Sequence, residues 1–276
     1  MYTLNCKGRL LVIDKPIVMG ILNLTPDSFF IGSRVSSVDH ALEQADKMLR
    51  DGATILDIGG QSTRPGSEEI SETEELKRVL PAIQAIADRF PTAYLSIDTY
   101  YSTVAKTAIE AGACIVNDIS SGTIDTTMIA TIANLKVPYI AMHMKGKPAN
   151  MQQYAIYENV TLEVLDFFIK KIEECKKAGM QDVIIDPGFG FAKNISQNFT
   201  LLKQLSTLQM LQKPIMVGLS RKSTIYKTLN ITPEQSLNGT TVLNTVALQN
   251  GANILRVHDV KEAIETIRLL DALFNQ

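Results

Sequence analysis

The sequence predicts a single (β/α)8 TIM barrel, an α/β fold of parallel strands and outer helices, over residues 1–276. Three observations predict it. Eight short apolar runs recur along the chain, the segments between them have helical apolar spacing, and several of those segments end in glycine just before the next run. The length of 276 residues is also close to that of a typical barrel of this kind.

Each apolar run closes on a polar or ionisable residue. Near-continuous apolar runs are typical of strands buried on both faces, where polar groups fit only at the strand ends. The runs are residues 18–24, 54–60, 94–99, 114–120, 139–144, 183–189, 215–220 and 254–259. Because the carboxyl ends of all barrel strands meet at one rim, the closing residues predict an active-site rim.

Residues 71–90 illustrate the helices expected between the runs. Ser71-Glu72-Thr73-Glu74 is a capping-box pattern. One helical face then carries Leu76, Val79, Leu80, Ile83, Ile86, Ala87 and Phe90. Pro81 removes a hydrogen bond and crowds the preceding turn, so a kink or a late helix start is expected there. Further apolar stripes contain Val164, Phe168, Ile172 and Cys175, and Val260, Ala263, Ile264, Ile267 and Phe274.

Four helical stretches end in glycine directly before an apolar run. These glycines are Gly52, Gly112, Gly179 and Gly251. Glycine adopts the left-handed backbone conformation without a Cβ penalty, so it commonly ends a helix. The repeated glycine therefore supports the alternation of strand and helix independently of hydrophobicity.

Composition predicts one soluble domain with no global attraction to anions. The chain is 45% hydrophobic and 20% charged, within the ordinary range for soluble domains, and its net charge is −2. A nucleic-acid or membrane surface is therefore not expected as a partner. Three widely spaced cysteines match no metal-ligand spacing, and charges interrupt the apolar residues near the N-terminus. Together these features predict a cytoplasmic protein.

Three of the predicted rim loops carry groups suited to anion binding. They are residues 23–29, 59–66 and 218–223, which contain glycines, hydroxyl groups and the cations Arg64, Arg221 and Lys222. Glycine lets a backbone approach a ligand, while hydroxyl groups and backbone amides donate hydrogen bonds to phosphate oxygens. Each stretch alone is more typical of a plain turn, but their joint placement at strand ends favours a binding site.

Carboxylates and amides at the inner rim indicate a polar flat ligand. Asp98, Asn117 and Asp186 should point into the barrel mouth from different strands, with Lys222 on the seventh loop. A buried carboxylate needs a partner, and a heterocycle with adjacent N–H donors would supply one. The alternative is that the aspartates cap turns or form internal ion pairs. Asp57 and Asp118 are assigned to this structural role.

The last run contains Arg256-Val257-His258, which places Arg256 and His258 on one strand face. The pair would suit a diphosphate leaving group. The alternative, a histidine that satisfies a buried backbone group, stays equally open. His143, between Met142 and Met144, is interpreted as a pocket wall rather than a catalytic base. No His, Cys and carboxylate cluster has the spacing of a structural zinc site.

Eight ordered motifs over nearly the whole length resemble those of bacterial dihydropteroate synthases. They are the stretches 19–29 (Met-Gly-Ile-Leu-Asn-Leu-Thr-Pro-Asp-Ser-Phe), 62–66 (Ser-Thr-Arg-Pro-Gly), 96–99 (Ser-Ile-Asp-Thr), 117–119 (Asn-Asp-Ile), 142–144 (Met-His-Met), 186–191 (Asp-Pro-Gly-Phe-Gly-Phe), 220–223 (Ser-Arg-Lys-Ser) and 256–259 (Arg-Val-His-Asp). The resemblance implies a transferase of folate biosynthesis. Such an enzyme joins 4-aminobenzoate to 6-hydroxymethyl-7,8-dihydropterin diphosphate and releases diphosphate and 7,8-dihydropteroate.

The resemblance also implies roles for individual residues. Those that would hold the pterin are Asp98, Asn117, Met142, Asp186, Lys222 and Arg256. Those that would hold the diphosphate are Asn23, Thr63, Arg256 and His258, with Asn23 also reaching a Mg²⁺ ion. Those that would shape the aminobenzoate pocket, which sulfonamides also enter, are Asp27, Phe29, Arg64, Pro65, Phe191, Lys222 and Ser223, and further substrate-binding residues are Gly218 and Ser220. The catalytic set is Asp98, Lys222, Arg256 and His258, and the resemblance implies a homodimer.

The expected mechanism is a dissociative substitution. Mg²⁺, Arg256 and His258 would stabilise the departing diphosphate, and Asp98 the pterin cation. An arylamine is already nucleophilic at neutral pH, so no strong base is needed. Gln61, where many members have Glu, and Phe29-Phe30-Ile31-Gly32 depart from the family pattern and bear on loop closure and sulfonamide affinity.

Two alternatives are kept. A methyltetrahydrofolate-dependent methyltransferase would share the inner Asp and Asn groups but would not need Lys222 or the pair Arg256 and His258. A non-catalytic pterin-binding paralogue would bind pterin diphosphate without forming product. Intact Asp27, Arg64 and Lys222 argue against the paralogue.

Overall fold

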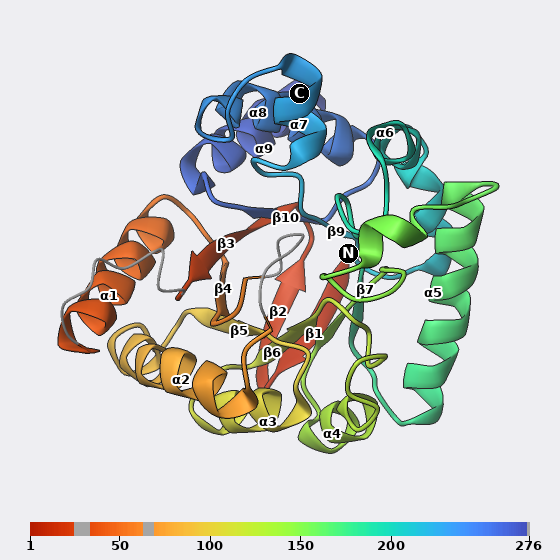
Figure 1. The fold of residues 1–276 in the computed structure, drawn as a ribbon. Coiled ribbons are helices and arrows are strands. Elements are labelled where there is room, and N and C mark those ends of the chain that lie inside the picture. Colours follow the sequence, from red (N-terminus) through yellow and green to blue (C-terminus); the bar gives the residue numbers. More distant parts are fainter. Residues whose placement is uncertain (25–33, 63–68, 275–276) are drawn as a thin grey trace.

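The computed structural model describes residues 1–24, 34–62 and 69–274, of which 34–37 by backbone alone. Eight parallel strands form a nearly closed barrel in the order β8-β7-β6-β5-β4-β3-β10-β9 (Figure 1). The strands are β3 (Ile17–Asn23), β4 (Ile55–Gly59), β5 (Tyr94–Asp98), β6 (Ile115–Asp118), β7 (Tyr139–Met142), β8 (Val183–Asp186), β9 (Met216–Val217) and β10 (Ile254–Val257). A single bridge from Ile185 to Ile215 joins the two outer strands. The predicted TIM barrel is confirmed.

Helices surround the barrel (Figure 1). In the part of the chain that is described they are α1 (Arg34–Arg50), α2 (Glu72–Arg89), α3 (Ser102–Glu110), α4 (Met128–Leu135), α5 (Val160–Lys177), α6 (Ile195–Lys203), α7 (Ser223–Leu229), α8 (Leu237–Gln249) and α9 (Val260–Phe274). Short 3-10 helices occupy Met151–Tyr154, Leu205–Leu211 and Glu234–Ser236. None of these described helices is long and apolar enough to cross a membrane.

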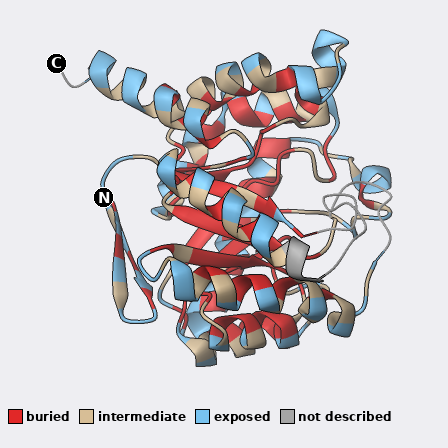
Figure 2. Cartoon of the chain, turned by 90° about the vertical axis from the view of Figure 1, so that its left-hand side faces the viewer, coloured by how far each residue is buried: buried red, intermediate tan, exposed pale blue. Residues whose placement is uncertain are grey.

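Alternation along each strand separates the barrel interior from the layer under the helices. In β4, Leu56 and Ile58 belong to the large outer core, while Ile55 belongs to a separate inner cluster. The other barrel strands show the same pattern, because successive strand residues point alternately into the barrel and out towards the helices. Inner residues near the strand starts are Met19, Ile55, Ile115, Ile140, Ile184, Met216 and Ile254. They fill the barrel near its N-terminal end, and the strands are largely buried (Figure 2).

The glycines predicted to end helices have the expected backbone. Gly52, Gly112, Gly179 and Gly251 have φ values of 105°, 125°, 90° and 95°. Each is in the left-handed half of conformational space, where a Cβ would be strained. The predicted helix stops are therefore confirmed.

Pro81 does not delay the start of α2. The helix begins at Glu72 and runs through the proline to Arg89. Ser71 accepts a hydrogen bond from the Glu74 amide, as the capping pattern predicted, while the Glu74 carboxylate pairs with Arg78. The late helix start was wrong because the capped first turn and the buried apolar face outweigh the one bond that Pro81 removes.

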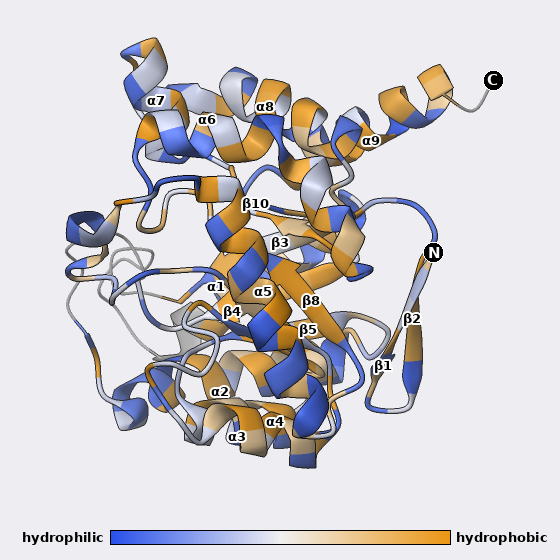
Figure 3. Cartoon of the chain, turned by 90° about the vertical axis from the view of Figure 1, so that its right-hand side faces the viewer, coloured by the Kyte–Doolittle hydropathy of each residue, from blue (hydrophilic) through white to orange (hydrophobic). Residues whose placement is uncertain are grey.

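An N-terminal β-hairpin, which the sequence reading did not include, covers the barrel floor. Strands β1 (Tyr2–Cys6) and β2 (Arg9–Ile13) pair antiparallel around Lys7 and Gly8. Both turn residues have positive φ, as in a type I′ turn. The apolar side of the hairpin packs on the inner cluster through Leu4, Cys6, Leu11 and Ile13. It therefore seals the end of the barrel at which the strands begin (Figures 2 and 3).

Candidate active site

The mouth of the barrel is lined by the last inward-facing residue of each strand. These residues are Asn23, Gly59, Asp98, Asn117, Met142, Asp186, Gly218 and Arg256, where Gly218 directly follows β9. Neighbouring strands pair Asn23 with Gly59, Asp98 with Asn117, and Met142 with Asp186. The structure thus brings the predicted inner-rim residues to one end of one barrel.

Arg256 is the centre of the polar cluster at the mouth. Its Nε donates to Asp57 Oδ2 at 2.6 Å, and its Nη2 donates to Asp98 Oδ2. The Asn117 amide also donates to Asp57 Oδ2, at 2.9 Å. Asp57 is fully buried, so this one carboxylate orients both a cation and an amide that face the mouth. Asp57 is structural, as predicted, but its role is to position the site.

Burial changes the acidity of the cluster. It raises the pKa of Asp98 to about 7, although the neighbouring Arg256 acts in the opposite direction and Asp57 adds repulsion. Burial alone would lower the pKa of Arg256, but Asp57 and Asp98 raise it instead. Arg256 is therefore a permanent cation between two carboxylates, and Asp98 is the member whose charge can change near neutral pH.

Lys222 and Asp186 form the second charged part of the mouth. Burial lowers the pKa of Lys222 to about 8, and Asp186 opposes that shift. The Lys222 Nζ donates to the Phe189 carbonyl and lies 4.7 Å from the centre of the Phe191 ring. Burial raises the pKa of Asp186, while Lys222 and a hydrogen bond from the Gly188 amide lower it. Two acids and two cations therefore face each other across a largely buried space.

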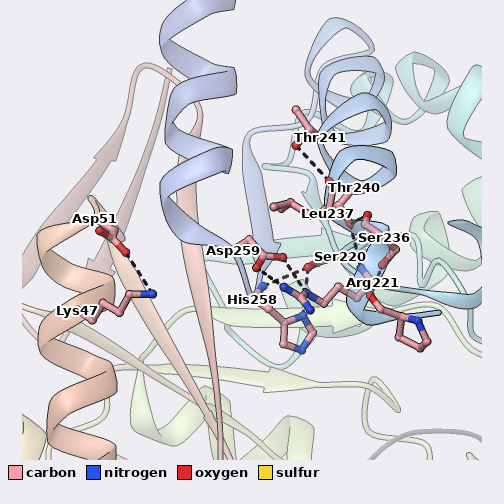
Figure 4. A network of polar contacts seen from close by, with 11 residues as sticks. Lys47, Asp51, Ser220, Arg221, Ser236, Leu237, Thr240, Thr241, His258 and Asp259 are labelled. Carbon is pink, nitrogen blue, oxygen red and sulfur yellow. Dashed lines mark hydrogen bonds and ion pairs between the residues drawn. The ribbon is translucent and has the colours of Figure 1, made fainter. Parts of the chain in front are cut away.

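His258 contacts the loop after β9. It lies one residue beyond β10, is exposed, and its Nδ1 is 3.1 Å from Ser220 Oγ. Arg221 next to Ser220 forms two hydrogen bonds with Asp259, at 2.9 and 2.6 Å (Figure 4). These contacts tie the loop after β9 to the loop after β10. Arg256 lies in β10 and His258 directly follows it, so both are at the end of one strand, and their binding of one ligand stays a prediction.

Several other predicted residues border the same mouth. Met142 forms a small buried cluster with Tyr100 and Ile119, against which Phe191 packs. Ser223 begins α7 directly after Lys222. A Cβ on Gly218 would lie 3.6 Å from the Lys222 Nζ. The predicted residues Asp27, Phe29, Thr63, Arg64 and Pro65 lie outside the described residues.

The structure also places Asp118, predicted to be structural, and His143, predicted to line the pocket. Asp118 accepts four hydrogen bonds, from Ser120 (amide and hydroxyl), Gly122 and Tyr139, as a structural residue should. His143 was expected to form a pocket wall. Instead it is buried behind Met142, edge-on to Phe167 at 4.9 Å between ring centres. Strand alternation explains this, because the residue after an inward-facing Met142 points outward.

Glu75 on α2 is a buried acid next to the site. Its Oε2 accepts a hydrogen bond from Thr99, the residue after Asp98, and burial raises its pKa to about 8. The folded state thus holds this proton more tightly than the unfolded state. Stability is therefore lost as pH rises from about 4.5 to 8, at about 1.4 kcal/mol per pH unit.

Glu75→Gln should remove that loss, since the amide side chain stays neutral at every pH and keeps an acceptor for Thr99. We expect the variant to gain roughly 2 kcal/mol or more of stability relative to wild type between pH 5 and pH 8. Urea unfolding at both pH values measures this, with the exposed Glu110→Gln as the control. A difference that does not grow with pH would contradict a neutral Glu75.

Comparison with known proteins identifies the family. Residues 19–258 match the family described as pterin binding enzyme. The dihydropteroate synthase of Escherichia coli K12 is 42% identical over 268 residues, which cover 96% of this chain and 94% of that enzyme. The chain belongs to the dihydropteroate synthase family.

Solved structures agree with this assignment. A dihydropteroate synthase of Yersinia pestis, determined as a sulfonamide drug complex, is 42% identical and matches with a TM-score of 0.93 over 100% of both chains. The Xanthomonas albilineans dihydropteroate synthase in complex with 7,8-dihydropteroate matches with a TM-score of 0.89 at 35% identity, over 99% of this chain and 98% of that one. The predicted family resemblance is confirmed, and so is the assignment to the transferases of folate synthesis. These matches favour a synthase over the methyltransferase alternative.

Proposed function

We propose that this dihydropteroate synthase joins 4-aminobenzoate to 6-hydroxymethyl-7,8-dihydropterin diphosphate at the mouth described above. The observation that carries the proposal is the polar cluster in which Arg256 bridges Asp57 and Asp98, opposite Asp186 and Lys222. Such a cluster offers both acceptors and cations in a space shielded from water. The Xanthomonas albilineans complex with 7,8-dihydropteroate supports the choice of product.

The pterin would be held by the inner rim. Asp98 and Asp186 supply carboxylate acceptors for ring N–H groups, and Asn117 keeps its amide oxygen for the ring because only its amide nitrogen bonds Asp57. Lys222 would donate to a ring acceptor. Met142 offers an apolar contact beside the ring. Complementary polar edges of this kind discriminate a pterin from rings without those groups.

The diphosphate would lie towards β3 and β10. Arg256 uses two N–H groups on Asp57 and Asp98, which leaves three of its five for phosphate oxygens. His258 and Asn23 are exposed at the rim, and Thr63 belongs to the same proposed set. Each of these groups suits a leaving diphosphate.

The donor set also fits a Mg²⁺ ion. Among the described residues no group of His, Cys, Asp and Glu could hold a metal alone. Mg²⁺ bound with a diphosphate needs few protein ligands, because phosphates and water supply the others. Asn23, whose Oδ1 lies beside Gly59 at the open rim, would be the protein ligand. A bound Mg²⁺ would neutralise charge on the leaving group.

The reaction would proceed as a dissociative substitution. The bond between the pterin methylene carbon and the diphosphate oxygen breaks first, and Arg256 and His258 stabilise the departing anion. Asp98, as carboxylate, stabilises the methylene cation. The 4-aminobenzoate amine then attacks and afterwards releases a proton to solvent. Its pocket would be formed by Phe191, Gly218, Ser220, Lys222 and Ser223, together with Asp27, Phe29, Arg64 and Pro65. Sulfonamides would bind in the same pocket, as the Yersinia pestis complex suggests.

The test is product formation by the purified protein. Dihydropteroate and diphosphate are measured with the dihydropterin diphosphate and Mg²⁺, with and without 4-aminobenzoate. We expect product only when both substrates are present. Tight binding of the pterin diphosphate without product would support the non-catalytic paralogue and overturn the proposal.

Such a synthase would act in the cytoplasm, where its buried free cysteines stay reduced.

We further propose a homodimer formed through the C-terminal helices. Apolar residues are exposed on both α8 and α9: Leu269 is 74% exposed, and Val242 and Leu273 are exposed as well. Figure 3 shows hydrophobic segments on these two helices. Such residues are expected at an isologous interface. The double variant Leu269→Glu and Leu273→Glu should convert a dimer to a monomer in light scattering. Ile169→Glu on α5, also exposed and apolar, is the control and should stay dimeric. A monomeric wild type would contradict the proposal.

A further inference from the structure

Lys193 is a buried lysine that the proposed reaction does not use. It is only 3% exposed and lies between Phe191 and the start of α6. Its Nζ is surrounded by four acceptors: His143 Nδ1 at 3.0 Å, Gly188 O at 3.0 Å, Phe191 O at 3.1 Å and His143 O at 3.4 Å. A buried ammonium group is costly unless such partners surround it. Burial lowers the pKa of Lys193 to about 7, and Asp186 opposes that shift. Both the ammonium group and the neutral amine can donate to these acceptors.

The acceptors belong to the loop between β8 and α6 and to the end of β7. Gly188 and Gly190 have φ values of 71° and 82°, and the Phe191 amide donates to the Gly188 carbonyl at 3.1 Å in a turn. Side chains add further contacts to this turn. Asp186 accepts from the Gly188 amide at 2.8 Å, and Asn198 accepts from the Gly190 amide at 2.7 Å. Lys193 adds the contacts that bind the loop carbonyls to β7.

His143, the residue directly after β7, is the point against which the loop is held. Burial lowers its pKa to about 2, so the ring is neutral and its Nδ1 can accept a hydrogen bond from Lys193. A Cβ on Gly188 would lie 2.1 Å from the His143 carbonyl oxygen, so the two backbones touch. Lys193 closes this contact by donating to both residues. The loop is thereby held against β7 at a defined distance.

The same loop carries groups of the proposed substrate pocket. The Phe189 carbonyl accepts from Lys222, and the Phe191 ring lies under the Lys222 ammonium at 4.7 Å. Lys193 donates to the carbonyls of Gly188 and Phe191, one on each side of Phe189 in the chain. The two lysines thus bind three carbonyls of one short loop. A shift of the loop away from β7 would move the Phe191 ring.

We propose that Lys193 is a positioning residue that acts through Phe191, by holding the loop 187–192 against His143. The proposal rests on the proposed function, in which Phe191 shapes the aminobenzoate pocket. Loss of Lys193 should therefore weaken aminobenzoate binding, because the pocket wall becomes mobile. The pterin should be affected much less, because Asp98, Asn117 and Asp186 lie on barrel strands and Asp186 still attracts Lys222.

The test compares Lys193→Met, which keeps length and removes the charge, with Lys203→Met at the exposed end of α6. The first readout is steady-state kinetics. For Lys193→Met we expect the KM for 4-aminobenzoate to rise about tenfold, with the KM for the pterin diphosphate and kcat each within about threefold of wild type. The second readout is amide hydrogen exchange over residues 187–193, which does not depend on activity. Exchange there should be at least about tenfold faster, and unchanged elsewhere.

His143→Phe is the milder companion variant. It replaces the imidazole with an aromatic ring that can still pack on Phe167 and removes both ring nitrogens, including the Nδ1 that Lys193 contacts, so it should fold and show the same changes at smaller size. The proposal would be overturned if both variants had the same amide exchange rates and the same kinetic constants as wild type. Faster exchange of the loop with unchanged kinetics, or faster exchange throughout the molecule, would overturn it as well. An inactive wild type would overturn the proposed function instead, and the exchange data would still report on the loop.

Discussion

Arg256→Ala should lower kcat/KM by about a hundredfold or more. The variant removes the only side chain that contacts both Asp57 and Asp98 among the described residues and that offers further N–H groups to the diphosphate. Loss of one contact to charge that develops in the transition state costs about 3 kcal/mol, which is roughly a hundredfold in rate. Steady-state kinetics with both substrates varied measures the effect.

Stability must be separated from catalysis in this variant. Without Arg256, two buried carboxylates lose their cation, and breaking a buried pair typically costs about 3–5 kcal/mol of stability. Kinetics should therefore be measured well below the thermal midpoint, which calorimetry provides. The exposed Arg268→Ala on α9 should change neither quantity. A kcat/KM near the wild-type value in a folded Arg256→Ala would end the assignment of Arg256 to the diphosphate.

Asp98→Ala should also lower kcat/KM by about a hundredfold or more, because the variant loses the carboxylate proposed to hold the pterin and its methylene cation. Asp98→Asn keeps the shape and removes only the charge, so it should show most of the same loss. The exposed Asp88→Ala on α2 serves as the control. If folded Asp98→Asn kept nearly full activity, a role for the charge would be contradicted.

The pH profile gives a second check on Asp98. Burial raises its pKa to about 7, and the proposed active form is the carboxylate. The kcat/KM of wild type should therefore rise with pH through about 7, below the pKa of about 8 at which Lys222 loses its proton. Asp98→Asn should lack this rise. A wild-type profile flat between pH 6 and 8 would show that Asp98 is already ionised, with its pKa governed by Arg256.

Sequence patterns predicted the strands and their polar ends well, for a physical reason. A strand covered on both sides admits polar side chains only at its end, so Asp98, Asn117 and Asp186 were visible as rim residues. Asp57 was harder, because it lies inside an apolar run. Its parity with Ile55 places it inside the barrel, so the alternation along β4 could have placed it next to Arg256.

Contacts between loops were beyond the sequence patterns. Lys193 follows glycines and precedes an asparagine that caps α6, which is typical of an exposed loop. Its burial depends on where β7 and β8 place His143 and Gly188, and a local pattern holds no information about that. The outward position of His143 could have been predicted from the sequence, because successive strand residues alternate between faces and Met142 points inward. The hairpin could also have been predicted, because apolar residues alternate with other residues on both sides of the Lys7-Gly8 turn; they are Leu4, Cys6, Leu11 and Ile13.

The hairpin on the barrel floor has a consequence for the order of folding. Its anchors come from far along the chain: Lys7 donates to Ile109 O, Arg9 to Pro91 O, and the Asn5 amide to Asp182. A growing chain therefore makes β1 and β2 long before the strands that cover them. Until β10 emerges, the apolar side of the hairpin has no complete partner and is open to wrong pairing. Substitutions there should reduce the yield of refolded protein more than the activity of the molecules that fold.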